Sequence, residues 1–178
     1  MIIERFLNAS LYFAEKTQRL DTIKLYKLLF LADRACIKKT GHTITEATYR
    51  KIKPWGPVPK EAKALVDGVA AGDKVSSRIS EFLKVEKQGN NIHIKFTGPA
   101  DLSYFTREEI QILKNLAVKH KSTSGKKIAH GVHNMRIANT MEWEKDFHMD
   151  VFLPPKEKRM SQENRKIADK FRLALADV

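Results

Sequence analysis

Apolar residues recur every three or four positions through several long stretches of the chain, a spacing typical of helices that bury one face. The spacing predicts a first helix over residues 2–16 and a second over residues 22–40, which Asp21 can cap at its start. Gly41 can end the second helix in a left-handed conformation. Because the second helix has only a narrow polar stripe, we expect it to lie at the centre of the fold.

Further helices are predicted downstream of the second one. One follows Pro59, and another follows Thr106, which can form a capping box with Glu109. A shorter helix is expected over residues 125–133. Strict alternation of apolar and polar residues is convincing only in residues 83–96, on either side of a glycine-containing turn, and it predicts a β-hairpin there.

Together these elements predict a mainly α (α+β) fold, a single compact helical domain with one small antiparallel β-hairpin. We expect the domain to occupy residues 1–150 and a basic, helical C-terminal tail to occupy residues 151–178. A chain of 178 residues suits one sizeable core. The sequence contains no apolar run approaching the roughly 20 residues that cross a bilayer, so we expect no membrane partner.

The chain carries a formal net charge of +12, spread along its length without a polybasic arm. Such a charge attracts acidic proteins or nucleic acid, but diffuse charge does not by itself create an element that reads a groove. The single Cys36 cannot form an intrachain disulfide, which favours a reducing, cytoplasmic location. Because Cys36 lies in the most apolar helix, we expect a buried structural role; the alternative is a nucleophile with His42 as its base.

Residues suited to catalysis or metal binding form no recognised motif in the sequence. His130 and His133 lie three residues apart and can share a helical face, but zinc usually takes three or four well-placed donors. The sequence has no Cys pair, no His-Glu-x-x-His motif, no phosphate-binding glycine loop and no Gly-x-Ser-x-Gly turn. We therefore expect neither an enzyme nor a bound metal or cofactor.

A proline-rich corner at residues 53–59 displays a tryptophan. Each proline fixes its own backbone angle and restricts the residue before it, so the corner should be stiff. A stiff loop loses little entropy when it binds, which makes this corner the candidate partner-binding site. Its predicted contact residues are Lys53, Trp55, Pro57 and Val58. In the alternative, Trp55 fills an edge of the core while Pro59 starts the next helix.

Several short motifs occur in a characteristic order. A helix reading close to Lys-Leu-Leu-Tyr-Phe-Ala-Asp is followed by a glycine, an Ile-Thr pair, a tyrosine, and a lysine shortly before Gly-Pro-Val-Pro. The matching positions are Lys27, Leu28, Leu29, Leu31, Ala32, Asp33, Gly41, Ile44, Thr45, Tyr49, Lys53, Gly56, Pro57, Val58 and Pro59. A second block includes Glu108, Glu109, Ile110, Leu113, His130 and Trp143. In this order and spacing, residues 1–150 resemble the Panacea, or SocA-like, antitoxin-associated domain family.

The resemblance implies a protein-binding module that recognises a cognate toxin and blocks it, or escorts it to a protease, with no turnover and no cofactor. It also implies that His130 and Trp143 form a packing and hydrogen-bonding pair. The charge supports a second hypothesis, a basic nucleic-acid-binding protein that regulates its own operon or is carried by a phage. The third hypothesis, an uncharacterised enzyme, requires titrating groups that converge in a cleft.

Overall fold

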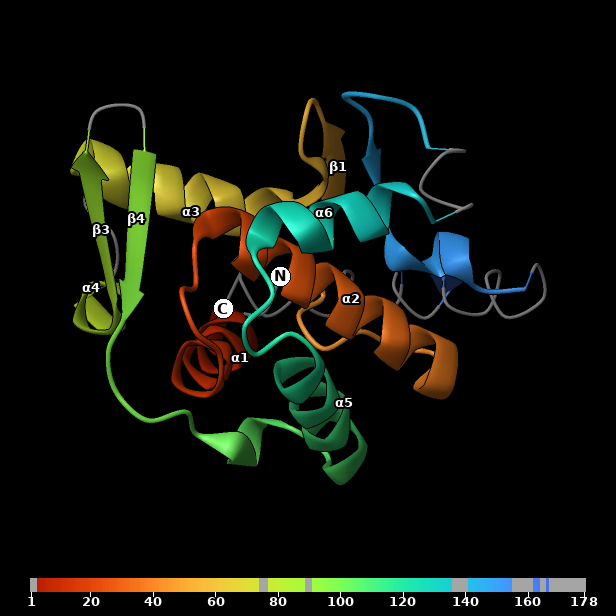
Figure 1. The fold of residues 1–178 in the computed structure, drawn as a ribbon. Coiled ribbons are helices and arrows are strands. Elements are labelled where there is room, and N and C mark those ends of the chain that lie inside the picture. Colours follow the sequence, from red (N-terminus) through yellow and green to blue (C-terminus); the bar gives the residue numbers. More distant parts are fainter. Residues whose placement is uncertain are drawn as a thin grey trace, which may run out of the picture.

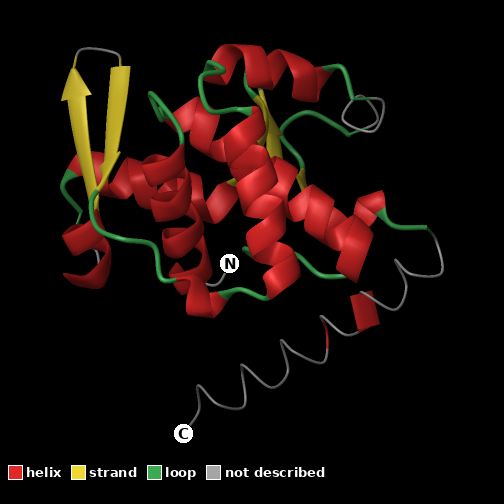
Figure 2. Ribbon diagram, turned by 60° about the horizontal axis from the view of Figure 1, so that its bottom comes forward, coloured by secondary structure: helices red, strands yellow, loops and turns green. Residues whose placement is uncertain are grey.

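The computed structural model describes residues 3–73, 77–88, 91–135 and 141–154, together with residues 162, 163 and 166. The described helices are α1 (Ile3–Lys16), α2 (Thr22–Thr40), α3 (Lys60–Ala71), α4 (Ser77–Phe82), α5 (Arg107–Lys119) and α6 (Gly125–His133), with 3-10 turns η1 (Leu102–Tyr104) and η2 (Met149–Phe152). The predicted mainly α, α+β class is confirmed. Among the described residues the strands form two small sheets, and Figure 2 shows them beside the helices and loops that make up the rest of the structure.

Helix α2 lies at the centre, with α1, α5 and α6 packed around it (Figure 1). The Asp21 side chain accepts a hydrogen bond from the Lys24 backbone N–H at 2.7 Å, which satisfies one of the free amides at the start of the helix. At the other end Gly41 has a φ of 79°, and its N–H donates to the carbonyl of Ile37. Both predicted ends of the central helix are therefore confirmed.

The predicted hairpin is also confirmed. Strands β3 (Leu83–Gln88) and β4 (Asn91–Phe96) pair antiparallel, with Val85 opposite Ile94. The hairpin covers a small second core that consists of Val66, Ile79 and Leu83. Because a two-stranded hairpin is marginal alone in water, this contact with α3 and α4 supplies the apolar surface that it needs.

A three-stranded sheet, in the order β2-β1-β5, corrects the expectation of a single hairpin. It contains β1 (Tyr49–Ile52), β2 (Gly56–Pro59) and β5 (Asp146–Phe147). The proline-rich corner is thus the turn and second strand of another hairpin. The two prolines of β2 argued against a strand, because proline has no N–H to donate to a neighbouring strand. Strand β2 lies at the edge of the sheet, where a missing N–H is tolerated.

The capping box predicted at the start of α5 is present. Thr106 Oγ1 accepts from the Glu109 N–H at 3.3 Å, and Glu109 Oε2 accepts from the Thr106 N–H at 2.8 Å. These two reciprocal bonds set the point at which α5 begins. They also place the Glu109 side chain in the interior, where it is fully buried.

The main core gathers side chains from all parts of the domain. Its fully buried members include Phe6, Phe13, Leu25, Leu28, Leu29, Phe30, Ile44, Tyr49 and Leu113. Phe152 and Leu153, which follow the boundary expected at residue 150, are buried in the same core. Most of the predicted C-terminal tail helix lies outside the described residues. Among the described residues, no helix is both long enough and apolar enough to cross a membrane.

Candidate functional site

The β1–β2 hairpin is anchored to α2 by a buried lysine. Lys27 is completely buried, and its Nζ donates a hydrogen bond to the carbonyl oxygen of Pro57. Burial lowers the pKa of Lys27 to about 7, because the charged ammonium loses its hydration in the core. A polar group so far from water requires this partner, so the side chain ties the position of β2 to that of α2.

A buried carboxylate on the same helix holds the segment that leads into the hairpin. Asp33 accepts hydrogen bonds from the backbone N–H groups of Ile44 and Thr45 at 2.8 and 2.9 Å. It also accepts from the Thr45 hydroxyl and, at 2.8 Å, from the Tyr49 hydroxyl. Burial raises the pKa of Asp33, and these four donors oppose that effect. One side chain therefore organises the loop from residue 44 to residue 49.

Gly56 completes the support of the hairpin. Its φ of 74° is a conformation that residues with a Cβ adopt rarely. A Cβ placed there would lie 2.4 Å from Nε2 of His133, so only glycine lets α6 approach the hairpin this closely. Two helices thus fix the hairpin. Helix α2 does so through Lys27 and Asp33, and α6 does so by packing His133 against Gly56.

The hairpin, the end of α6 and the segment before β5 together carry an aromatic and basic surface at one end of the molecule. Trp55, in the β1–β2 turn, is 40% exposed, and Trp143, in the segment before β5, is 41% exposed. The Nζ atoms of Lys51 and Lys53 lie 4.2 and 5.7 Å from the centre of the Trp143 ring, within the range of cation–π contact. We call Lys53, Trp55, His133 and Trp143 the tryptophan surface; Lys51 is buried beneath Trp143, and its Nζ donates to the Met141 carbonyl at 2.9 Å.

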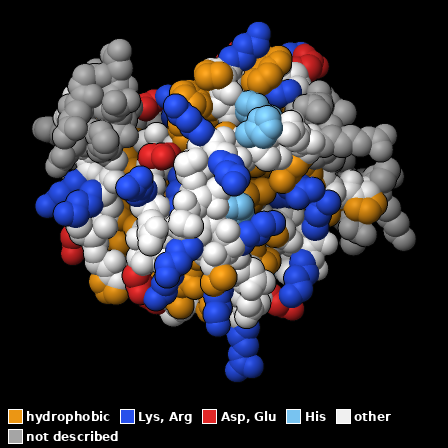
Figure 3. Space-filling view, in the orientation of Figure 1, with side chains coloured by type: hydrophobic (Ala, Val, Ile, Leu, Met, Phe, Trp, Pro, Cys, Tyr) orange, Lys and Arg blue, Asp and Glu red, His pale blue; other side chains and the backbone are white. Residues whose placement is uncertain are grey.

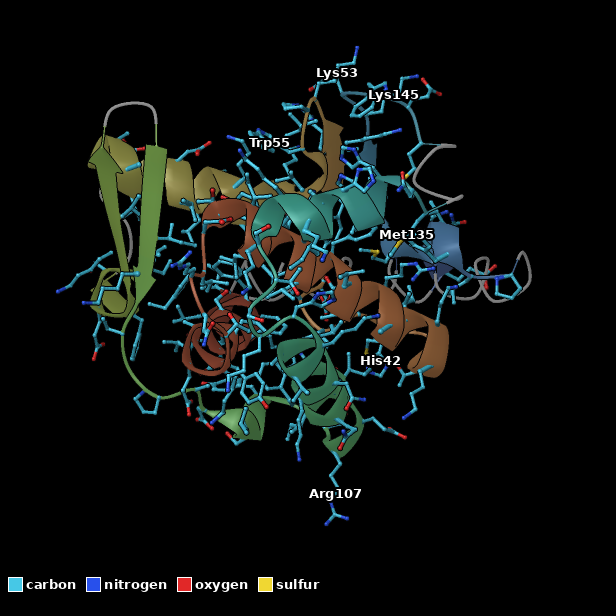
Figure 4. All side chains as sticks on the ribbon, viewed as in Figure 1. His42, Lys53, Trp55, Arg107, Met135 and Lys145 are labelled. Atoms are coloured by element: carbon cyan, nitrogen blue, oxygen red, sulfur yellow. The ribbon has the colours of Figure 1, made fainter. Side chains whose placement is uncertain are left out.

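The figures place this surface at the hairpin. Figure 4 shows Lys53, Trp55 and Lys145 at the end of the molecule that carries the β1–β2 turn. Figure 3 shows hydrophobic, histidine and basic side chains side by side at that end. An exposed apolar group bordered by charges is the composition expected of a site for another protein.

Ion pairs hold the segment with Trp143 against the hairpin. Asp146 pairs with Arg50 at 2.5 Å and with Lys60 at 2.7 Å. These hydrogen-bonded cations lower the pKa of Asp146 to about 2. The Glu144 N–H also donates to the carbonyl of Lys51 at 2.8 Å. The two tryptophans, which are 88 positions apart in the sequence, are thereby presented by one supported unit.

The structure divides the four predicted contact residues into two pairs. Lys53 and Trp55 are exposed, whereas Pro57 and Val58 are buried beneath them. Pro57 contributes its carbonyl to the bond with Lys27, and Val58 belongs to the main core. Sequence reasoning did not include Trp143 in this site, although a tryptophan among charged and polar residues was a usable signal.

The pairing expected between His130 and Trp143 is wrong. His130 is exposed, and its Nε2 lies 3.1 Å from the side-chain nitrogen of Asn134. The ring that meets Trp143 is that of His133, in an edge-on arrangement with centroids 6.4 Å apart. The two histidines lie three residues apart on one helix, so sequence spacing alone could not show which one faces the tryptophan.

A second group of reactive side chains converges between α2 and α5. The ligand atoms of Cys36, His42 and Glu109 all lie within 4.8 Å of one another. Cys36 is buried, as predicted, and burial raises the pKa of its thiol to about 11. A thiol held in its neutral form is a poor nucleophile, so this geometry does not favour the Cys36–His42 catalytic alternative.

Comparison with protein families matches residues 25–144 to the family described as "Antitoxin SocA-like, Panacea domain". The chain belongs to that family. Comparisons with curated proteins and with solved structures found no match. The matched region contains Lys27, Asp33 and Gly56 together with the two tryptophans. The Panacea motif residues Lys27 and Asp33 therefore support the hairpin from within the fold, and their buried positions argue for a structural role.

Proposed function

We propose that this Panacea domain is an antitoxin-like module that binds a cognate toxin in the cytoplasm and neutralises it by covering part of its surface. Family membership supports an antitoxin-like role in general. The observation that carries the binding mechanism is the tryptophan surface, in which one exposed indole ring lies in the turn of a hairpin held by buried polar contacts and the other lies in the segment that leads into β5. The mechanism requires no turnover and no cofactor.

The chemistry of the surface indicates the kind of toxin segment that fits. Tryptophan is enriched among the residues that dominate binding energy, since it buries a large area at little entropic cost. The exposed ammonium group of Lys53 beside Trp143 and the net charge of +12 favour a partner with carboxylates around an apolar centre. We therefore expect an acidic toxin surface whose central apolar side chains contact Trp55 and Trp143.

Capture from native cells, with a nuclease step and a high-salt wash, tests the proposal. A stoichiometric small protein that is toxic when expressed alone, and harmless when expressed with this chain, would support the antitoxin function. Absence of any protein partner, with nucleic acid lost on digestion, would reject it. Measuring the toxin's half-life with and without this chain then separates simple occlusion from delivery to a protease, because only delivery shortens it.

A pair of matched substitutions tests the assigned surface. Replacing Trp55 by alanine should weaken toxin binding about 30-fold, because losing a central tryptophan typically costs about 2 kcal/mol or more. Val118→Ala is the control, since Val118 is 71% exposed on α5 and lies outside the tryptophan surface. Equal affinity of the Trp55→Ala variant and the wild-type protein, with unchanged circular dichroism, would show that the toxin binds elsewhere.

A basic face favours nucleic-acid binding as a second candidate. Figure 3 shows lysine and arginine side chains spread over the face that carries α5 and α6. The exposed lysines of these helices and their connection are Lys114, Lys119, Lys121, Lys126 and Lys127. Binding that falls steeply with salt and shows no preference between sequences would identify the attraction as nonspecific, since phosphate contacts alone produce that behaviour.

A further inference from the structure

Three potential metal ligands meet where the end of α2 approaches the start of α5. Cys36 belongs to the last turns of α2, His42 follows that helix, and Glu109 lies in the first turn of α5. His42 Nε2 lies 3.4 Å from Glu109 Oε1, and Cys36 Sγ lies 4.0 Å from the same oxygen. Figure 4 shows His42 far from Lys53 and Trp55, so this cluster is separate from the tryptophan surface.

The spacing of the donor atoms suits a small tetrahedral ion. With bonds of about 2.0 Å to nitrogen or oxygen and about 2.3 Å to sulfur, donors at the corners of a tetrahedron lie roughly 3.3 to 3.5 Å apart. The separations of 3.4 Å from His42 Nε2 and 4.0 Å from Cys36 Sγ to Glu109 Oε1 approach these values, and all three atoms lie within 4.8 Å of one another. We propose that Cys36, His42 and Glu109 bind one zinc-like divalent cation, with water in the fourth position.

The combination of ligands selects the class of ion. A thiolate and an imidazole favour zinc and chemically similar transition metals, whereas magnesium and calcium take shells made of oxygen ligands. The cluster is open to solvent on one side. The His42 side chain is 55% exposed, whereas Cys36 and Glu109 are buried. Water and the ion can therefore reach the cluster from the His42 side.

Binding requires two local rearrangements. Arg5 now contacts the Glu109 oxygen that would bind the ion, so this contact must open. Because Arg5 also donates from Nε to the Ile44 carbonyl at 2.6 Å and from NH1 to the Tyr104 carbonyl at 3.0 Å, its planar guanidinium stays in place, and the Glu109 carboxylate must turn away from it. The Cys36 thiol, which lies 3.3 Å from Thr40 Oγ1, must also release its proton to the solvent as the metal–sulfur bond forms.

Titration of the untagged full-length chain with Co²⁺ tests the site. Cobalt takes the place of zinc in such sites, and its bond to a thiolate gives a charge-transfer absorption band. We expect the band to saturate at one ion per chain, to disappear when Zn²⁺ is added, and to be absent from the Cys36→Ser variant. The His42→Ala variant should bind at least about tenfold more weakly, because it loses one ligand of three.

His42→Ala is the decisive variant, because His42 is exposed and its replacement leaves the core intact. The matched control is His130→Ala, since His130 is also exposed but contacts Asn134 outside the cluster. Its affinity for Co²⁺ should equal that of the wild-type protein. Absence of the charge-transfer band from the wild-type protein would overturn the proposal. A His42→Ala variant that binds Co²⁺ as tightly as the wild-type protein would overturn it as well.

Discussion

Replacing the buried Lys27 by methionine should change how the stability of the protein depends on pH. Methionine keeps the length of the side chain but cannot carry a proton or donate to the Pro57 carbonyl. The unsatisfied carbonyl should cost about 1 to 3 kcal/mol at every pH. The titration of Lys27 adds a second contribution, which does depend on pH and can be worked out from its pKa.

Burial lowers the pKa of Lys27 in the folded protein to about 7, whereas a lysine in the unfolded chain has a pKa of about 10.4. Below pH 7 the lysine is charged in both states, and the penalty for burying that charge reduces stability in full. Between pH 7 and about 10.4 the unfolded chain binds the extra proton, so the free energy of unfolding rises with pH. From pH 6 to pH 9 the gain should be about 2.5 kcal/mol.

Urea unfolding followed by circular dichroism, at pH 6, 7, 8 and 9, measures this gain. Subtracting the unfolding free energy of Lys27→Met from that of the wild-type protein removes the contribution of every other titrating group. This difference should increase by about 2.5 kcal/mol from pH 6 to pH 9. Lys38→Met is the control, because Lys38 is exposed on the same helix, and its curve should run parallel to that of the wild-type protein. Parallel curves for Lys27→Met would refute the reasoning.

Two further predictions concern the support of the hairpin. Asp33→Ala should lower the free energy of unfolding, measured by urea titration, by about 3 kcal/mol or more. The substitution leaves the buried donors on Ile44, Thr45 and Tyr49 without their acceptor. A loss below about 1 kcal/mol would contradict the role assigned to Asp33. Gly56→Ala should destabilise the protein by about 2 kcal/mol or more, because φ is positive at this position and the added Cβ would collide with His133. Gly131→Ala is the control on α6: its added Cβ meets open space, so the helix-favouring alanine should stabilise the protein by up to about 1 kcal/mol. Thermal unfolding should therefore show a lower midpoint for Gly56→Ala and a higher one for Gly131→Ala.

The helices other than α4, which was not predicted, could be recognised in the sequence because their signals are local. The Asp21 cap, the Gly41 end and the Thr106–Glu109 capping box each depend on residues within a few positions of one another. Strands β1 and β2 were missed because each has only four residues, and two of those in β2 are prolines. Their pairing depends on the support of α2 beneath them, which no local pattern encodes.

The candidate sites were only partly predictable for a related reason. Trp55 and Lys53 stood out in the proline-rich corner, and the structure exposes both. Trp143 joins them because β5 pairs with β1 across nearly 100 positions of the chain. Glu109 was recognised only as a capping residue, although its buried carboxylate also meets Arg5, which is 104 positions away. Long-range partners of this kind leave no periodicity in the sequence.

The sequence by itself determined both ends of α2, the start of α5, the single Cys36, the basic charge and the motif order of the Panacea family. Tertiary structure decided what the motif residues do: it buries Lys27 and Asp33 beneath a hairpin and leaves Trp55 in solvent. The physical reason is that helix periodicity and capping involve neighbours along the chain. Burial and the pairing of distant polar groups arise only when the elements pack.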